Sequence, residues 1–195
     1  MRSLIICMTT AASMLLTANI EANARALTSQ VTELDHIFRV RPEYPVPDDP
    51  NILFYIERSV NSNTVVYAAH FDSNGHVDWN SPVDAYWRWY NVDGHRKPLN
   101  FIERMMAYGV KAVVHGPDGT TTFKVAALPE RKLVLDLDSH GHPEALMRFA
   151  GRWVKLVYVY LQVDDSGFLP DVTSMDIFGT DKITGAALRE HVVPR

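Results

Sequence analysis

The sequence predicts a mainly β domain, folded as an antiparallel meander that closes into a barrel or a strongly curled sheet. From Asn51 onward, short runs of β-type residues are separated by turn dipeptides such as Asn74-Gly75 and Asp93-Gly94, which is the pattern of consecutive hairpins. Several runs alternate apolar and polar residues, as half-buried strands do. Short connections favour a meander, and about eight or nine strands are enough to close a barrel. A two-sheet β-sandwich is the alternative, because period-two alternation is the same in both architectures.

Residues 1–24 have the three parts of a secretory signal peptide. Arg2 supplies the positive start, residues 4–16 supply a short apolar run, and Ala22-Asn23-Ala24 supplies small residues for cleavage near Ala24. The apolar run is shorter than the ~20 residues that a membrane-spanning helix needs. We therefore expect a periplasmic or secreted protein whose mature chain has no transmembrane anchor.

Residues 25–50 form a proline-rich N-terminal spacer before the single β domain of residues 51–195. Pro42, Pro45, Pro47 and Pro50 deny the backbone regular ladders and favour an extended path. Both a flexible leader and a strap across the fold fit this composition. The alternation of apolar residues with the prolines favours the strap.

The expected strands follow in order, with one short helix near residues 99–108. They cover residues 52–59, 64–71, 82–90, 110–115, 120–127, 131–138, 145–149, 153–163 and 172–178. Asn100 can cap the helix and Gly109 suits its end, while Phe101, Met105 and Tyr108 fall near one face.

Alternation also indicates which faces of the strands are buried. Residues 82–90 and 131–138 place apolar side chains on one side and mostly polar ones on the other, so both strands are expected to be half buried. Residues 153–163 carry apolar side chains on both sides. We expect this strand to be covered on both faces, with the helix or the proline-rich segment as its outer cover.

The composition argues against several classes of function. The net charge is −4 and the basic residues form no run, which argues against nucleic-acid binding. The only cysteine, Cys7, lies in the predicted signal peptide, so the mature chain has no thiol nucleophile and no disulfide. We find no nucleophile elbow, zinc-protease, P-loop or dinucleotide-binding motif. A non-enzyme without a cofactor is the favoured class, and a divalent metal is the alternative.

The aromatic band of residues 86–90 is the expected ligand-binding segment. Tyr86, Arg88 and Tyr90 share one side of a strand, and the Arg88 guanidinium can bind a carboxylate or phosphate. A scaffold role is the competing interpretation and the one that the spacing favours, because aromatic residues at period two usually form core and cross-strand pairs.

Residues 136–142 contain the densest group of metal-ligating side chains. Asp138, His140 and His142 are the candidate ligands, offering oxygen and imidazole donors to a divalent ion. A solvated strand end that runs into a polar turn is the competing interpretation. His70 and His115, which lie inside expected strands, are further candidates for a buried or cleft-facing imidazole.

Short motifs follow one another along the β domain in a defined order and spacing. They are Phe54-Tyr55-Ile56-Glu57-Arg58-Ser59, Asn61, Asn63, Val65-Val66-Tyr67, Pro82-Val83, Tyr86-Trp87, Ala107-Tyr108-Gly109, Phe178-Gly179-Thr180-Asp181 and Thr184-Gly185. Together they resemble the domain of unknown function 4833, over about residues 51–193. The resemblance implies a secreted or periplasmic bacterial domain, and it brings no established activity or catalytic residue.

The leading hypothesis is a non-catalytic binding or accessory module of the cell envelope. Its curled sheet would hold a small or amphipathic ligand, or an envelope protein partner, against aromatic and arginine side chains. An alternative is a metal-assisted hydrolase in which Asp138, His140 and His142 hold the ion that activates water. A third hypothesis is a structural protein-interaction domain that uses neither ligand nor metal.

Overall fold

The computed structural model describes residues 39–117, 120–167 and 170–194. The predicted signal peptide, residues 1–24, and most of the predicted spacer lie outside these residues. The chain divides into two compact units, Met1–Pro42 and Glu43–Arg195, and the β fold belongs to the second. No helix within the described ranges is long and apolar enough to cross a membrane.

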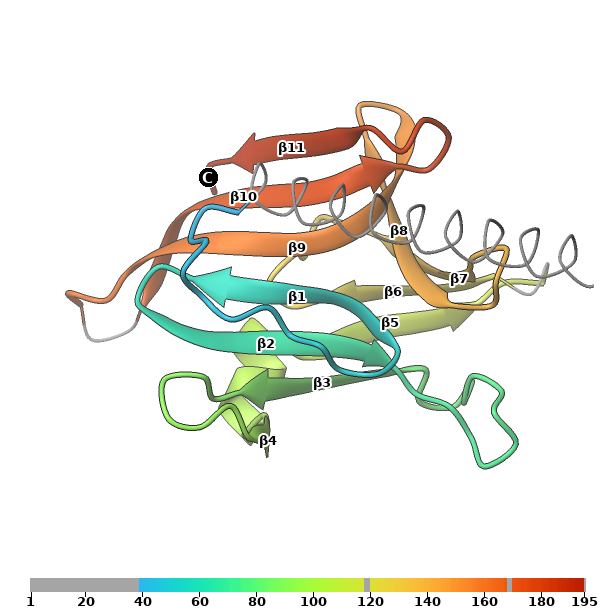
Figure 1. Cartoon of the computed structure of the whole chain (residues 1–195), viewed down its shortest axis with the longest axis horizontal. Coiled ribbons are helices and arrows are strands. Elements are labelled where there is room, and N and C mark those ends of the chain that lie inside the picture. Colours follow the sequence, from blue (N-terminus) through green and yellow to red (C-terminus); the bar gives the residue numbers. More distant parts are fainter. Residues whose placement is uncertain (1–38, 118–119, 168–169, 195) are drawn as a thin grey trace, which may run out of the picture. The chain divides into compact units, whose positions relative to one another are not determined.

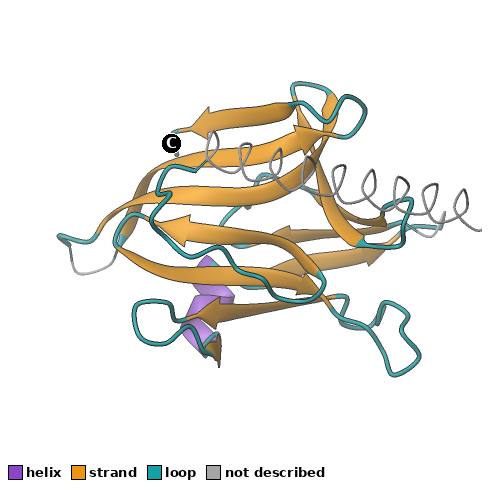
Figure 2. Ribbon diagram, viewed as in Figure 1, coloured by secondary structure: helices purple, strands orange, loops and turns teal. Residues whose placement is uncertain are grey.

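The second unit is built on an eleven-stranded sheet (Figures 1 and 2). Its strands are β1 (Ile52–Arg58), β2 (Asn61–Ala69), β3 (Val83–Arg88), β4 (Arg96–Pro98), β5 (Val110–His115), β6 (Thr121–Val125), β7 (Leu133–Leu137), β8 (Pro143–Phe149), β9 (Arg152–Asp164), β10 (Asp171–Asp181) and β11 (Ala187–Val192), and a helical turn, η1 (Glu103–Ala107), precedes β5. The predicted mainly β class is therefore confirmed.

The strands follow the order β4-β3-β2-β1-β9-β8-β7-β6-β5, with β10 on the other edge of β9 and β11 beyond β10. Every neighbouring pair is antiparallel except β1 and β9, which run parallel. The predicted meander holds on both sides of this pair. The parallel pair is an exception to the meander. Strand β9 pairs with β1 although strands β2 to β8 separate the two in the sequence, and turn signals between neighbouring strands do not predict such a long-range pairing.

The long strand β9 divides the sheet into two wings. Residues 152–155 pair with β8, residues 158–161 pair with β1, and β10 follows the opposite edge. One wing therefore runs from β1 to β4 and the other from β8 to β5, and the two curl toward each other as a half-barrel (Figure 1). The curled-sheet prediction is confirmed. Among the described residues no ladder joins β3 to β5, so the half-barrel stays open at that seam.

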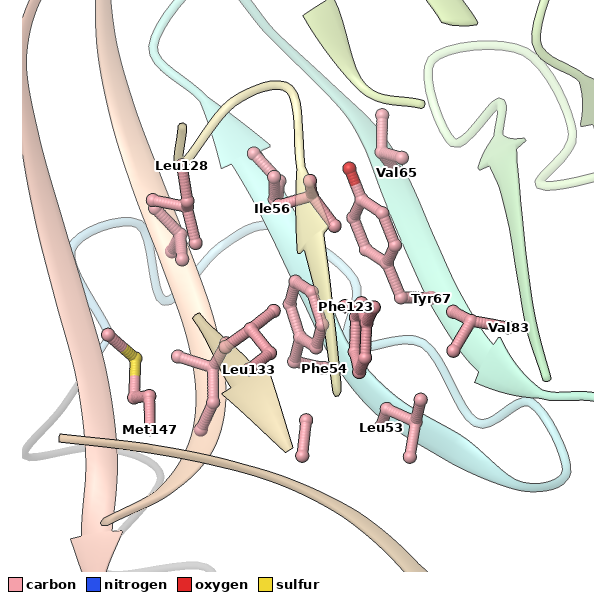
Figure 3. Packing of buried hydrophobic residues seen from close by; sticks show 14 of the residues in the cluster. Leu53, Phe54, Ile56, Val65, Tyr67, Val83, Phe123, Leu128, Leu133 and Met147 are labelled. Atoms are coloured by element: carbon pink, nitrogen blue, oxygen red, sulfur yellow. The ribbon is translucent and has the colours of Figure 1, made fainter. Parts of the chain in front are cut away.

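The hydrophobic core fills the space between the wings (Figure 3). Phe54 and Tyr67 come from one wing and stack with ring centroids 4.4 Å apart, while Phe123 and Met147 come from the other. The buried Tyr67 hydroxyl donates a 2.7 Å hydrogen bond to the carbonyl of Tyr108. This bond satisfies the one polar group that Tyr67 brings into the core.

The middle of strand β9 is buried on both faces, as predicted, but its first half is buried on one face only, because Trp153 and Val157 are exposed. Val159 and Leu161 belong to the core, while Tyr158 and Tyr160 are buried on the opposite face. On that face Tyr158 stacks between Tyr55 and Phe178, with centroid separations of 5.3 and 4.4 Å. An aromatic row thus runs across β1, β9 and β10, and it stiffens the part of the sheet where the wings diverge.

The predicted helix near residues 99–108 is shorter than expected and has a different periodicity. Asn100 caps it as predicted, through reciprocal bonds with Glu103 of 2.7 and 2.9 Å. The turn then becomes a π-turn, in which the Tyr108 amide donates to the Glu103 carbonyl. Side chains spaced for an α-helix no longer share a face in a π-turn. Only Tyr108 of the predicted apolar face is buried, whereas Phe101 and Met105 are exposed.

The short strand β4 and the edge strand β11 were not predicted from the sequence. All three residues of β4 are exposed, and the strand contains Pro98, so it shows no apolar alternation. Strand β11 pairs with the edge of β10 and is itself an edge strand. It contains Arg189 and Glu190, and none of its residues is buried. Edge strands need little apolar character, which explains why the alternation pattern missed both.

Candidate functional site

The predicted ligand-binding side chains of β3 hold a carboxylate of the chain itself. Arg88 donates through Nε and Nη2 to Asp49, with N–O distances between 2.7 and 3.0 Å. The Tyr86 hydroxyl donates to the same carboxylate at 2.8 Å. The expectation that Arg88 can bind a carboxylate is chemically sound. Its partner in the structure is Asp49, which the sequence analysis did not single out.

Burial makes this carboxylate pairing strong. The Asp49 side chain is 4% exposed and that of Arg88 is 25% exposed. Burial, followed by the bond to Asp49, raises the pKa of Tyr86, and the bond to Asp49 raises the pKa of Arg88. Tyr86 therefore remains a neutral donor and Arg88 a cation over the whole working range of pH.

Asp49 belongs to a segment that crosses the sheet, the strap, defined as Glu43–Pro50. Pro47 is buried as well as Asp49, and the Tyr44 hydroxyl lies 3.5 Å from the Ser59 carbonyl oxygen. These contacts fit the strap interpretation of the proline-rich segment. Since prolines lack an amide donor, the side-chain bonds of Asp49 hold the strap in place of a ladder.

Tyr90, the third predicted ligand-binding residue, lies near enough to Arg88 and Asp49 to feel their charges. It is half buried at the end of the β3–β4 hairpin, where burial raises its pKa. Gly94 in that turn has a φ of +77°, and a Cβ there would lie 3.2 Å from the Tyr90 ring. Lys97 of β4 covers the neighbouring Trp89 ring at 3.5 Å. Tyr90 therefore packs against the hairpin turn, while Tyr86 and Arg88 hold the strap.

The predicted metal ligands form the turn between β7 and β8. Oδ1 of Asp138 accepts the backbone amides of His140 and His142 at 2.8 and 2.9 Å, and His142 Nδ1 lies 3.3 Å from Oδ2. These bonds, chiefly that from the His142 amide, lower the pKa of Asp138 to about 2. The two imidazole rings are 6.1 Å apart. The described residues contain no group of three or more side chains placed to hold a metal ion.

An identical turn occurs elsewhere in the chain without a second histidine. Residues 72–76 and 138–142 both read Asp-Ser-x-Gly-His. In the first, Asp72 Oδ1 accepts the amides of Asn74 and His76 at 2.8 and 3.0 Å, and Gly75 adopts a φ of +79°. Asp138 and Gly141 repeat this arrangement. The recurrence favours the solvated-turn interpretation of residues 136–142.

His70 and His115, the two histidines expected to be buried or cleft-facing, are both accessible. Nδ1 of His70 lies 3.2 Å from the Ser81 carbonyl oxygen, and its side chain is partly exposed. Nδ1 of His115 lies 3.0 Å from the Thr121 hydroxyl, and its ring meets Trp79 edge-on. The expectation that these imidazoles are buried is therefore wrong. Each lies at a strand end, where the chain leaves the sheet.

A groove of about 240 Å³ opens at the seam where β3 and β5 face each other without a ladder. It is lined by Ser81, Val83, Asp84, Ala85, Leu99, Arg104, Gly109 and Val110. Val83 and Leu99 belong to the hydrophobic core, so the floor of the groove is the edge of the core itself. Arg104 donates to the Leu99 carbonyl at 3.1 Å, and Asp84 lies 3.4 Å from Arg96. The groove thus has core residues at its base, whereas most of its exposed lining is polar.

Both strands that border the groove have free edges within the described part of the chain. Strand β5 pairs with β6 on its other side, and β4 reaches only residues 86–88 of β3, leaving residues 83–85 uncovered. A bulge between Lys111 and Val114, where Ala112 has a φ of 47°, interrupts β5. Unpaired N–H and C=O groups on such edges are able to accept another strand.

Beside the groove lies a concentration of exposed apolar side chains, the η1 patch, defined as Phe101, Ile102, Met105 and Met106. Phe101 is 75% exposed and Met106 is 68% exposed, and no residue of η1 is buried. Arg104 connects the patch to the groove, because it lies in η1 and lines the groove. Four large apolar side chains exposed within residues 101–106 indicate an interaction surface. The sequence contained a signal for this patch. Residues 101, 102, 105 and 106 are all large and apolar, which is more than a short helix with one buried face requires.

Comparison with known proteins adds a family match. The family described as "Domain of unknown function (DUF4833)" matches residues 54–191. This range includes the groove, the η1 patch and the Tyr86–Arg88 part of the strap contact. No curated protein and no solved structure shows significant similarity to the chain.

Proposed function

We propose that this chain, which belongs to the DUF4833 family of domains of unknown function, is a non-catalytic binding module of the bacterial cell envelope. Its partner is a protein, held through an extended peptide segment in the β3–β5 groove. The observation that carries the proposal is the groove itself, which lies between two free strand edges and has the hydrophobic core as its floor. The signal-peptide pattern of residues 1–24 supports export to the envelope.

The size of the groove favours a peptide side chain over a small molecule. Its volume of about 240 Å³ is below the ~300–1,000 Å³ of sites that enclose drug-sized ligands. An apolar side chain entering the groove would meet Val83, Leu99 and Val110, and it would extend the core by one layer. The groove is therefore sized for one side chain of a peptide, whose apolar part would contact Val83, Leu99 and Val110 while polar atoms of the segment face the mostly polar lining.

The backbone of the peptide finds partners on the same surface. A segment added in extended conformation beside β3 or β5 satisfies edge N–H and C=O groups that otherwise bond to water. The bulge in β5 keeps this ladder short, so the anchor side chain sets the register and most of the affinity. Arg104 at the rim favours an acidic residue next to the anchor. The preferred partner is thus an extended segment with an apolar residue beside an acidic one.

The remaining predicted site residues receive a different role in this proposal. Tyr86 and Arg88 hold the strap through Asp49, and so they fasten the N-terminal segment to the sheet. Tyr90 packs the hairpin next to them. Residues 138–142 form a turn, because the Asp138 carboxylate accepts the backbone amides of His140 and His142. The binding function therefore rests on the groove and the η1 patch.

Selection of peptides from a random display library on the purified protein tests the proposal. We expect extended peptides with an apolar–acidic pair, and slower amide hydrogen exchange in β5 when they bind. Val110→Lys fills the groove and Phe101→Glu charges the η1 patch. Each is expected to raise the Kd, measured by fluorescence polarisation, at least ~10-fold, which corresponds to ~1.4 kcal/mol.

Ile183→Glu is the matched control, because Ile183 is 92% exposed in the β10–β11 loop and lies outside the groove lining. It should bind selected peptides like the unmodified protein. Failure to select any peptide, or equal binding by the Val110 and Phe101 variants with unchanged melting, would contradict the proposal.

A further inference from the structure

Two adjacent methionines form half of the η1 patch. Met105 is 47% exposed and Met106 is 68% exposed, whereas Met147 in the core has no exposed surface. Met175 is partly buried against the core. The thioether sulfur is the oxidisable group of methionine, and its reactivity follows its access to solvent. The two methionines of η1 are therefore chemically distinct from Met147 and Met175.

We propose that Met105 and Met106 are a site of reversible oxidation to methionine sulfoxide, which turns the η1 patch from an apolar surface into a polar one. The inference rests on the proposed function in one respect: the patch borders the peptide-binding groove, so its oxidation weakens partner binding. The oxidant is hydrogen peroxide.

The reaction is a balanced two-electron oxidation. The thioether sulfur attacks one oxygen of the peroxide, the O–O bond breaks, an S–O bond forms, and the second oxygen leaves as water. Reduction back to the thioether by a dithiol-dependent sulfoxide reductase releases water and leaves a disulfide on the reductant. The only cysteine of the chain, Cys7, lies in the predicted signal peptide. In the mature protein, sulfur oxidation is therefore confined to methionine.

The placement of the pair lets oxidation change the surface without unfolding the domain. No residue of η1 is buried, so a sulfoxide oxygen there remains in water. The Asn100–Glu103 bonds hold the start of the turn, and Lys111 Nζ donates to the Met105 carbonyl at 2.9 Å. None of these bonds involves a thioether. A sulfoxide at Met147 would instead place a polar group in the core.

Oxidation changes how well the η1 patch can bind a partner. A flexible apolar methionine adapts to many partners and contributes contact area, which is why methionines are frequent on adaptable binding surfaces. The sulfoxide carries a strong acceptor that must be desolvated when a partner binds. Phe101 and Ile102 remain apolar. Oxidation is therefore expected to weaken binding without abolishing it.

The test treats the purified protein with hydrogen peroxide and follows each methionine by peptide mass spectrometry. We expect Met105 and Met106 to be oxidised at least ~10-fold faster than Met147. Fluorescence of the apolar dye ANS, which reports exposed hydrophobic surface, should fall in parallel while the melting temperature stays unchanged. The double variant Met105→Leu with Met106→Leu keeps apolar bulk without sulfur and should keep its ANS signal. Met175→Leu is the matched control and should respond like the unmodified protein.

The outcomes separate this inference from the proposed function. Equal oxidation rates at Met105, Met106 and Met147, or an ANS loss that persists in the double leucine variant, overturn the inference. Selected peptides that bind oxidised and reduced protein equally overturn it too, while leaving the proposed function intact. If no peptide is selected but the ANS response occurs and the leucine variant abolishes it, the oxidation site stands and the proposed function fails.

Discussion

Replacing Asp49 by asparagine should release the strap and lower the stability of the domain. The change keeps the shape of the side chain but removes the charge that Arg88 binds. The Asp49 carboxylate is 4% exposed and accepts bonds from Arg88 Nε and Nη2 and from the Tyr86 hydroxyl. Removing one partner of a buried ion pair costs ~3–5 kcal/mol. Arg88 is a quarter exposed and recovers some hydration, so we expect ~2–3 kcal/mol.

Thermal unfolding measures this loss. For a domain of this size 1 kcal/mol corresponds to ~2–4 °C in Tm, so Asp49→Asn should melt ~5–10 °C lower. Amide hydrogen exchange at Tyr44 and Val46 should accelerate, because the strap is then held less firmly. Asp48→Asn is the matched control, since the neighbouring Asp48 is exposed and should leave both readouts unchanged.

A double-mutant cycle separates the ion pair from the rest of the strap. Arg88→Met removes the buried cation, so adding it to Asp49→Asn should cost less than the sum of the two single changes. A Tm loss below ~2 °C in Asp49→Asn, with unchanged exchange in the strap, would refute the reasoning that this carboxylate holds the segment.

Three further changes test the backbone and the turns. Ala150 has a φ of 44° in the turn that it forms with Gly151, so Ala150→Gly should raise the stability by ~0.5–1 kcal/mol in urea unfolding; a loss of stability would contradict the strain argument. A Cβ at position 109 would collide with the Arg104 carbonyl, so Gly109→Ala should lower Tm by ~5 °C or more and disturb the groove; an unchanged Tm would show that the backbone adapts. Backbone amides lower the folded pKa of Asp138 to about 2, beneath the ~3.9 of an unfolded aspartate, so its stabilisation is present above pH ~4 and is lost as the pH falls toward 2. The Tm difference between the protein and Asp138→Asn should therefore shrink between pH 5 and pH 2, as thermal scans over roughly this range will show; a constant difference would count against the turn bonds.

Much of the local structure was predictable because it depends on near neighbours in the sequence. Asn100 and Glu103 are three residues apart and form the capping bonds that their spacing predicts. Tyr86 and Arg88 share a face because side chains alternate along a strand, and both reach Asp49. The turn glycines Gly75 and Gly141 adopt positive φ where the sequence placed reversals.

The candidate site was harder to predict because its parts come from distant positions. Arg88 had the expected chemistry, but its carboxylate partner lies 39 positions earlier in the chain. The groove joins Val83 of β3 to Val110 of β5, two strands that share no ladder. A π-turn placed Phe101 and Met105 in solvent, where α-helical spacing predicted one face with Tyr108.

By itself, the sequence determined the β class, the strand alternation, the turn positions and the resemblance to the family that residues 54–191 match. These properties follow from the period-two geometry of strands and from the backbone preferences of glycine, asparagine and aspartate, which act within a few residues. Only the tertiary structure decided the parallel β1–β9 pair, the open seam and the partner of Arg88. These depend on which distant strand edges and charges meet when the sheet curls around its core, and that choice is made by packing over the whole domain.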